Sequence, residues 1–291
     1  MSRLLAFAGH KQAGKTTASN FLHGYQLRAN GVIDGFDILE DGRLIIKTNA
    51  INHEGEEELT QGFLEVGRDD PEFADWAAYN MWPFVKKYSF ASPLKHISTE
   101  LFGLSHDNVY GSDAKKNTNT FFRWEDMPGV VTKKDRYTKK LIADGVVKYH
   151  KPGKMTHREF LQFFGTDVCR KIYDEIWFTK LLNDVHTEQP LIAIVDDCRF
   201  INEVESIQKT GGKVIYLSRS PYQDSHSSES ELDNYDDFDT VIDNSDLTIH
   251  ETNVKIISAL DDWGWLGRSV QPKPQTASDV ELVGGIHKIK E

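Results

Sequence analysis

Short apolar runs alternate along this chain with segments in which apolar residues recur at helical spacing. Runs that are apolar on both faces are typical of strands buried in a parallel sheet. Such runs cover residues 4–8, 191–195 and 214–217, and residues 85–90 are expected to form a further strand. Helical spacing covers residues 15–28, 202–209 and 253–263, and a short edge strand is expected at 240–243, with 247–249 as its turn. Strands that alternate with helices predict an α/β, three-layer fold with a mainly parallel sheet.

Residues 36–75 interrupt this alternation. Residues 37–39 and 44–46 flank a Glu-Asp-Gly turn at 40–42, which is the pattern of a β-hairpin. The stretch 53–73 is acidic and contains glycine, so it predicts a solvated surface loop. We therefore expect an inserted β-hairpin and loop segment within the α/β fold.

The segments after the insertion predict a short helix at 76–82 and a strand-to-helix turn at 89–95. Pro93 suits the first position of the helix that follows, and Gly103 would end that helix. Residues 105–157 are polar, irregular and rich in Lys. They fit either a surface loop or a substrate-side loop that carries cations.

Two further helices are predicted after residue 154. Thr156 and Glu159 have the spacing of a capping box at the start of the first helix. Gly165 and Thr166 are expected to break this helix, and Thr166 with Asp167 can cap the second one. Apolar residues at helical spacing predict a buried stripe on the second helix: Val168, Ile172, Ile176 and Trp177.

The domain organisation expected from the sequence is one domain over residues 1–267, followed by a tail. The insertion 36–75 lies within that domain, and residues 105–157 form its lid or substrate-side region. Residues 268–291 are linker-like in composition, which predicts a flexible C-terminal tail.

Four residues near the N-terminus fit the phosphate-binding pattern G-x-x-x-x-G-K-[ST], the P-loop: Gly9, Gly14, Lys15 and Thr16. The glycines let the backbone turn tightly and approach a phosphate closely. Backbone amides of residues 11–15 can converge on phosphate oxygens, and the helix N-terminus adds its positive dipole end. Lys15 would then reach the β- and γ-phosphates, while the Thr16 hydroxyl would ligate Mg²⁺.

Three segments with candidate binding groups follow predicted parallel strands: residues 9–17, 92–95 and 196–199. Ligands of open α/β sheets bind beyond the carboxyl ends of the strands. We therefore expect the three segments to contribute to one active site.

The third of these segments carries a pair of carboxylates and an arginine. A P-loop needs an acid near the metal at the end of a neighbouring strand. Either Asp196 or Asp197 can hold Mg²⁺ through water while the other caps the next helix, and their spacing does not rank them. Arg199 can pair with phosphate through two hydrogen bonds, or it can form a salt bridge with Glu203, four residues on.

Phosphoryl transfer needs cations that offset the charge spreading over the moving group. Four residues are candidates, and each alone could be an ordinary surface charge: Arg158, Arg170, Arg123 and Lys95.

Composition narrows the class of protein. The 291 residues carry 34 Lys and Arg against 45 Asp and Glu, a net charge of −11, which argues against a protein that coats a nucleic-acid polymer. No apolar run approaches the ~18 residues of a membrane span. Cys169 and Cys198 lie far apart, outside any C-x-x-C spacing, as reduced thiols of a cytoplasmic protein do.

Several segments, in the same order, resemble the deoxynucleoside monophosphate kinases of tailed bacteriophages. The matching segments are GHKQAGKTT (9–17), FASPLK (90–95), NVYG (108–111), REFLQFFGTDVCR (158–170) with Trp177, DCRFINE (197–203) and HSSE (226–229). The pattern LQ-x-FGTD-x-x-R followed by D-x-RF-x-NE is far more specific than the P-loop alone. The resemblance covers roughly residues 4–260 and implies a three-layer P-loop kinase fold and transfer from ATP to a deoxynucleoside monophosphate (dNMP).

The resemblance also implies roles for individual residues. ATP, with Mg²⁺, would be bound by the P-loop segment: Gly9, Lys11, Ala13, Gly14, Lys15, Thr16 and Thr17. The dNMP would be bound by residues of later segments, to which we add Arg123: Lys95, Arg158, Gln162, Gly165, Thr166, Arg170, Trp177, Asp197, Arg199 and Glu203. The arginines would lie on the phosphate and Trp177 near the base or sugar. We expect Lys15, Arg170 and Arg199 to be catalytic and Thr16 and Asp197 to hold Mg²⁺, which leaves Asp196 as an extra acid.

The chain departs from the family in some places, and other functions stay open. Thr16 stands where some relatives have an acid, so no general base is assigned. Loop closure, expected around residues 112–136, would exclude water. The alternatives are another small-molecule P-loop kinase, similar to dephospho-coenzyme A kinase, or a nucleotide-gated binding protein. The expected partners are ATP and a dNMP, without nucleic-acid polymer or membrane, and the resemblance suggests a homodimer in the host cytoplasm.

Overall fold

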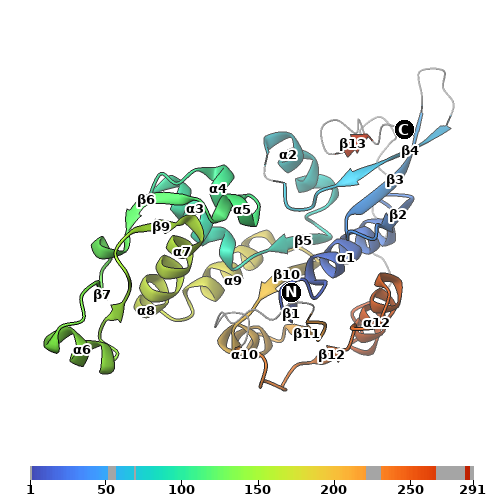
Figure 1. Ribbon diagram of the computed structural model, residues 1–291. Coiled ribbons are helices and arrows are strands. Elements are labelled where there is room, and N and C mark those ends of the chain that lie inside the picture. The colour runs from blue at the N-terminus through green and yellow to red at the C-terminus, as the bar shows by residue number, and fades with distance from the viewer. Residues whose placement is uncertain (1, 52–56, 69, 221–230, 267–285, 289–291) are drawn as a thin grey trace. The chain divides into compact units, whose positions relative to one another are not determined.

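The computed structural model describes residues 2–51, 57–68, 70–220, 231–266 and 286–288. The chain divides into two compact units (Figure 1). Unit 1 comprises Met1–Phe90 and Phe178–Glu291, and unit 2 comprises Ala91–Trp177. The organisation expected from the sequence, one domain over 1–267, did not include this division.

A five-stranded parallel sheet lies at the centre of unit 1, in the order β12-β11-β1-β10-β5. Its strands are β1 (Arg3–Gly9), β5 (Val85–Tyr88), β10 (Ile192–Cys198), β11 (Lys213–Leu217) and β12 (Thr240–Ile242). The apolar runs therefore form the expected strands, with the P-loop strand β1 in the middle and β12 at one edge. This confirms the α/β fold with a mainly parallel sheet.

Helices of unit 1 pack on the two faces of this sheet. They are α1 (Lys15–Ala29), α2 (Pro71–Asn80), α9 (Ile176–Glu188, which begins at the boundary between the units), α10 (Ile201–Lys209) and α12 (Ile249–Asp262). Helices α1 and α12 share one core cluster with β1, whereas α10 packs on β1 and β11 through Val204 and Ile207, which lie outside that cluster. None of the described helices is long and apolar enough to cross a membrane.

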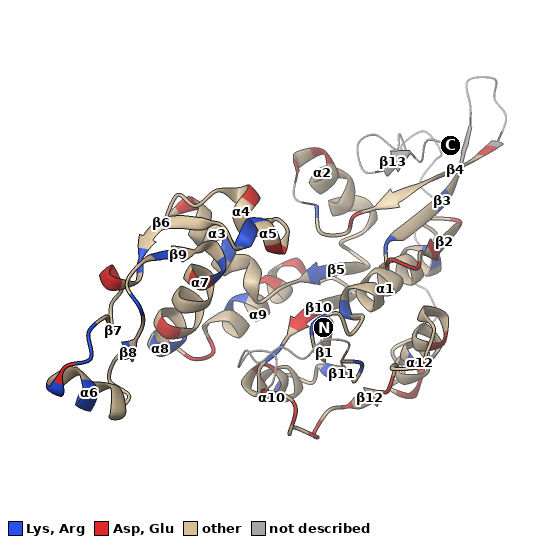
Figure 2. Cartoon of the chain, viewed as in Figure 1, with Lys and Arg blue, Asp and Glu red and all other residues tan. Residues whose placement is uncertain are grey.

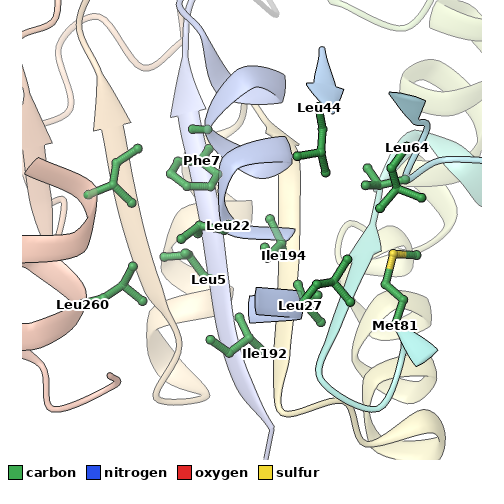
Figure 3. Packing of buried hydrophobic residues seen from close by; sticks show 14 of the residues in the cluster. Leu5, Phe7, Leu22, Leu27, Leu44, Leu64, Met81, Ile192, Ile194 and Leu260 are labelled. Atoms are coloured by element: carbon green, nitrogen blue, oxygen red, sulfur yellow. The ribbon is translucent and has the colours of Figure 1, made fainter. Parts of the chain in front are cut away.

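The core of unit 1 joins β1 to the helices of one face (Figure 3). Leu5 and Phe7 of β1 are completely buried and pack with Leu22 and Leu27 of α1 and with Leu260 of α12. Burial of each such side chain stabilises the fold by about 1.5–3 kcal/mol. This packing fixes the end of β1 relative to the start of α1, where the P-loop lies.

A second, antiparallel sheet is inserted between α1 and α2, in the order β13-β4-β3-β2. Its strands are β2 (Gly35–Ile38), β3 (Leu44–Ile51), β4 (Glu57–Leu64) and β13 (Ile286–Lys288). The hairpin expected over residues 37–46 is confirmed as β2 and β3. Most of the predicted tail lies outside the described residues, but Ile286–Lys288 pair with β4.

The prediction of an acidic surface loop is wrong for residues 57–64, which form β4. Backbone hydrogen bonds to β3 hold this strand in register from Glu57 to Phe63, and such bonds do not depend on the charge of the side chains. The two glutamates at its start and the exposed Leu59 conceal the hydrophobic pattern of a strand. Leu64 at its end and Val66, two residues further on, are buried in the core of unit 1.

Two helices of unit 1 begin earlier than their apolar pattern indicates. Helix α2 begins at Pro71, because the Asp70 carboxylate caps it by accepting the Phe73 amide at 3.1 Å. Helix α12 begins at Ile249, and Thr248 forms a capping box with Glu251. Residues 248 and 249 are thus a helix start, which corrects the turn expected at 247–249.

Unit 2 is built of short helices and strands. They are α3 (Ala91–Glu100), α4 (His106–Tyr110), α5 (Asp113–Lys116), β6 (Asn119–Arg123), η1 (Trp124–Asp126), β7 (Val130–Val131), α6 (Arg136–Ala143), β8 (Lys148–Tyr149), β9 (Lys154–Thr156), α7 (His157–Gln162), η2 (Phe163–Cys169) and α8 (Arg170–Ile172). Because α3 begins at Ala91, Pro93 is its third residue and not its first.

The prediction that residues 105–157 are irregular is wrong. The segment contains α4, α5 and α6, and β6 pairs antiparallel with β9. Val109 and Met155 are completely buried and pack with Phe160 and Phe163 of the following helices. Its elements are short and its surface is rich in Lys, so neither a helical nor a strand period extends far enough to be visible in the sequence.

The helix after Thr156 is not broken at Gly165 and Thr166, as the sequence suggested. The capping box of Thr156 and Glu159 is confirmed, but α7 continues through a π-helical turn, η2, into α8. Gly165 lies inside this turn, at a position where a side chain would not fit. A Cβ there would lie 2.7 Å from a methyl carbon of Leu94. The wide turn changes the phase of the apolar face, so Ile172 is 78% exposed and not part of a buried stripe.

Candidate active site

The P-loop of unit 1 is the left-handed turn that joins β1 to α1. Gly9 has a φ of +136°, and a Cβ at this position would lie 2.4 Å from the Leu217 carbonyl oxygen of β11. Gln12 and Gly14 also have positive φ, at +61° and +103°. The loop therefore requires glycine at position 9 because only a bare backbone fits between the two strands.

Lys15 is the most strongly perturbed charged group of this loop. Its side chain is 7% exposed, and Nζ donates hydrogen bonds to the carbonyl oxygens of Gly9 and His10, both at 2.6 Å. Burial, followed by the positive charge of Arg199, lowers the pKa of Lys15 from 10.5 to about 8. The ammonium is thus held against the backbone of the loop. Because it is shielded from water, its attraction for an added anion is stronger than that of an exposed lysine.

The backbone amides of the first turn of α1 have no partner within the helix, as at every helix N-terminus. Its N-cap is Gly14, without a capping side chain, and its first turn contains no acidic residue. Thr16 is exposed, whereas Ala13 is completely buried. A helix N-terminus of this kind favours an anion such as a phosphate.

Two neighbouring carboxylates at the end of β10 have different surroundings. Asp196 is buried and forms an ion pair with Lys87 of β5, at 2.8 Å. Asp197 accepts hydrogen bonds from the Ser89 hydroxyl at 2.6 Å and from the Phe90 amide at 3.0 Å. Asp197 therefore holds the chain that follows β5, and the helix after β10 is capped by another residue.

Glu203 supplies the cap of that helix, α10. Its carboxylate accepts the amides of Arg199 at 2.9 Å and Phe200 at 3.2 Å, and its side chain is 3% exposed. This contact with Arg199 is made to its backbone amide. Glu203 fixes the backbone from which the half-buried Arg199 side chain extends.

A second loop, after β11 and β12, holds the P-loop from the other side. Asn244 is 4% exposed; its Nδ2 donates to the Ala13 carbonyl at 2.8 Å, and its Oδ1 accepts the Arg219 amide at 3.0 Å. His10 pairs with Asp233 at 2.9 Å. Sequence analysis did not identify Asn244, although its place two residues after an edge strand, at the carboxyl end of the sheet, was a usable signal.

In unit 2, the residues expected to bind a dNMP lie on α7, η2, α8 and the start of α9, and on the elements before them. Arg158 pairs with Asp113 at 2.6 Å and donates to the Asn117 side chain at 3.1 Å. Trp177 is 6% exposed and donates from Nε1 to the Gly165 carbonyl at 3.3 Å. Trp177 and Gly165 are therefore brought together by the fold of this unit.

The remaining predicted residues of unit 2 are more exposed. Arg123 pairs with Glu125 at 2.6 Å on the surface, and Lys95 lies 5.2 Å from the centroid of the Tyr110 ring. Gln162 and Arg170 are half-buried, and Thr166 is exposed. Figure 2 shows further Lys and Arg residues along α6 and β8 of this unit.

The model of the deoxynucleotide monophosphate kinase family matches residues 126–256, which include Arg158, Arg170 and the Asp197–Glu203 segment. A protein of Acanthamoeba polyphaga mimivirus, whose name assigns it to the deoxynucleotide monophosphate kinases, is 30% identical over 192 residues, which are 61% of this chain and 83% of the viral protein. The chain belongs to the deoxynucleotide monophosphate kinase family.

This assignment confirms the family resemblance that the sequence motifs carry. The deoxynucleotide monophosphate kinase match also covers the HSSE motif at 226–229, which lies outside the described residues. No group of three or more His, Cys, Asp or Glu side chains is arranged to hold a metal ion within the described ranges.

Proposed function

We propose that this phosphotransferase uses ATP as the donor and transfers its γ-phosphoryl group to a deoxynucleoside monophosphate, giving dNDP and ADP. A phosphate oxygen of the monophosphate would form the new bond to the γ-phosphorus. The bond from the γ-phosphorus to the bridging oxygen would break, and that oxygen would keep the electron pair on ADP. The observation that carries the donor assignment is the buried Lys15, which lies in the P-loop beside the uncapped start of α1.

The donor site proposed for ATP is the P-loop segment. Lys15 would move from the Gly9 and His10 carbonyls to the β- and γ-phosphates, because a phosphate oxygen is a stronger acceptor than a neutral carbonyl. The amides of residues 11–17 would bind the same phosphates. Asn244 would keep the Ala13 carbonyl turned away from them, since it already donates to that oxygen.

Mg²⁺ is the cofactor we propose, brought to the site with ATP. The donor set fits such an ion, because Mg²⁺ keeps several waters and needs few protein ligands beside the nucleotide phosphates. Thr16 is exposed on the first turn of α1 and can supply its hydroxyl. Both oxygens of Asp197 accept hydrogen bonds from residues 89 and 90, so this carboxylate would act through water. When bound, the ion would offset charge on the transferred group.

The acceptor side is proposed to lie on residues 158–177 of unit 2, within the segment that matches the family model. Arg158 and Arg170 would bind the phosphate of the dNMP. In unit 1, Arg199, whose backbone amide is held by Glu203, is proposed to be catalytic at the phosphate end of the P-loop. Arg158 would exchange Asp113, an exposed partner, for the phosphate. Trp177, packed on Gly165, would limit the space for the base or sugar.

An assay of ADP release with ATP·Mg²⁺ and each of dAMP, dCMP, dGMP and dTMP tests this function. Wild type should form ADP only when a suitable dNMP is present. Lys15→Ala should lose roughly 10²–10³-fold in kcat, whereas the matched control Lys209→Ala, an exposed lysine of α10, should keep full activity. ADP release that ignores the acceptor would contradict the proposal, as would equal rates for the two lysine variants.

A further inference from the structure

The acidic stretch of unit 1 that precedes β12, residues 231–239, is anchored to the fold by apolar side chains. Near its start, Leu232 is only 6% exposed. Near its end, Phe238 stacks on Tyr216 of β11, with the ring centroids 4.6 Å apart. Burial of apolar surface therefore holds this stretch in place, and the carboxylates on either side of Leu232 extend from a fixed backbone.

One of these carboxylates reaches the P-loop. Asp233 pairs with Nε2 of His10 at 2.9 Å, and the two side chains are 42% and 20% exposed. The carbonyl oxygen of His10 is one of the two acceptors that hold the Lys15 ammonium, at 2.6 Å. Asp233 therefore holds the residue on which one hydrogen bond of Lys15 depends.

The other carboxylate reaches the turn that leads from β10 into α10. Glu231 accepts the backbone amide of Ile201 at 3.2 Å. The two preceding amides of this turn, those of Arg199 and Phe200, are accepted by Glu203. Glu231 therefore adds a third carboxylate contact to the backbone from which the Arg199 side chain extends.

Lys15 and Arg199 are both cations, and they lie close enough to repel each other. The positive charge of Arg199 is the second cause, after burial, of the lowered pKa of Lys15. Two cations that repel each other keep a short spacing only when the backbone under each one is held. The structure supplies that restraint from one stretch, because Asp233 and Glu231 are separated only by the buried Leu232.

We propose that residues 231–233 form a brace that sets the spacing between Lys15 and Arg199, with Asp233 and Glu231 as positioning residues for phosphoryl transfer. The inference rests on the proposed function, in which both cations are catalytic. Cations offset the charge that spreads over the transferred group only when they are correctly placed, so a small displacement of either one slows the reaction. The two carboxylates act through His10 and Ile201, without contact to a nucleotide.

Partial exposure of the carboxylates is compatible with this role. An exposed ion pair is usually weak because both side chains lose conformational freedom when it forms. In the brace, the backbone between the two carboxylates is already anchored by Leu232, so less freedom is lost. A brace also needs to contribute little to overall stability, since its effect is on the relative position of two groups.

Steady-state kinetics of dNDP formation, with ATP·Mg²⁺ and the dNMP that gives the fastest turnover, test the brace. Asp233→Ala and Glu231→Ala should each lower kcat roughly fivefold or more, with the KM for dNMP within about twofold of wild type. Because the loss of either end releases the brace, the double variant should be no slower than the slower single variant. Asp236→Ala, which removes another exposed carboxylate of residues 231–239, is the matched control and should keep the wild-type kcat.

Two further comparisons separate positioning from a general effect on the fold. Asp233→Asn and Glu231→Gln keep an acceptor oxygen at each position, so they should recover most of the wild-type kcat. In an Arg199→Ala background, where one of the two cations is missing, Glu231→Ala should cause no further loss of kcat. The midpoint of urea unfolding should be the same for the alanine variants and wild type.

Several results would overturn the brace. These are a wild-type kcat in both alanine variants, losses that multiply in the double variant, and losses confined to the KM for dNMP. A lowered urea midpoint without recovery in the Asn and Gln variants would show that the carboxylates only stabilise the fold. All of these results leave the kinase in place, whereas a wild type that releases ADP and forms no dNDP would contradict the proposed function and the brace with it.

Discussion

Lys15 of the P-loop and Arg158 of unit 2 are both expected to bind phosphate, yet the chain holds them in opposite ways. Lys15 is 7% exposed, and its hydrogen-bond partners are backbone carbonyls that cannot move without the loop. The Arg158 side chain is 36% exposed and pairs with a carboxylate that is 55% exposed. Before any ligand arrives, the proposed donor-side cation is buried against backbone carbonyls, whereas the proposed acceptor-side cation is held by an exposed ion pair that is easily exchanged.

This difference follows from where each residue lies. Lys15 follows a strand buried in the middle of a parallel sheet, so its loop is constrained by β11 and by Asn244. Arg158 lies on a short helix whose other contacts are an aromatic cluster, in which Phe102 and Phe160 meet at 5.2 Å. Substitutions should therefore affect stability on the donor side and mainly ligand affinity on the acceptor side.

The largest effect is expected at Gly9. Gly9→Ala would place a Cβ 2.4 Å from the Leu217 carbonyl oxygen at a φ of +136°, so both a clash and backbone strain result. We expect a loss of about 3 kcal/mol or more in the free energy of unfolding, measured with urea. Gly211→Ala is the matched control, because Gly211 also has a positive φ, +80°, but no atom lies within 4 Å of its added Cβ. A loss at Gly9 no larger than that at Gly211 would show that the loop is not constrained by β11.

A smaller effect is expected from His23, a buried residue of α1. Burial lowers the pKa of His23 from 6.5 to about 4, with Nδ1 in contact with the Ser19 carbonyl at 2.8 Å. Between these values the unfolded chain binds a proton that the folded chain does not, so stability is lost as pH falls below 6.5. By pH 5 this residue should cost about 2 kcal/mol.

The variant His23→Asn isolates that contribution. Its unfolding free energy should fall less between pH 7 and pH 5 than that of wild type, by about 2 kcal/mol. His186→Asn, which changes an exposed histidine of α9, should follow the wild-type curve. Parallel curves for wild type and His23→Asn would mean that His23 is not kept neutral by the core of unit 1.

The smallest effect on stability is expected at Arg158. Because its ion pair is exposed, Arg158→Ala and Asp113→Asn should each change the free energy of unfolding by less than about 1 kcal/mol. Their kinetics should differ: Arg158→Ala should raise the KM for dNMP roughly tenfold or more, while Asp113→Asn should leave it unchanged or lower it. Equal effects of both substitutions on KM would indicate that Arg158 acts only by holding Asp113.

The elements that could be predicted from the sequence are those whose apolar pattern is continuous and whose side chains are buried. Residues 4–8 and 192–195 are buried on both faces, and Gly9 of the P-loop marks a position that admits no side chain. Strand β4 escaped detection because Glu57 and Glu58 stand at its start, and its pairing depends on the backbone of β3, which is not a property of the segment itself. The π-helical turn was missed because Gly165 usually signals a break, whereas here it permits contact with Leu94.

The site was predictable to a similar extent. Lys15 and Thr16 belong to a motif whose spacing is set by phosphate geometry, so they could be named in advance. The partners of Asp197 and Glu203 could not, because these carboxylates bind backbone amides and a hydroxyl that come together only in the fold. Asn244 belongs to no motif, and its position follows from long-range packing.

The most direct test of the central claim follows a labelled phosphate through one turnover. The protein is mixed with Mg²⁺ and ATP carrying a labelled γ-phosphate, together with the dNMP that it binds best, and the products are separated. The account predicts that the label appears on the dNDP and that Lys15→Ala slows this transfer by roughly 10²–10³-fold. Label recovered as inorganic phosphate, or retained on ATP while the dNMP is bound, would contradict it.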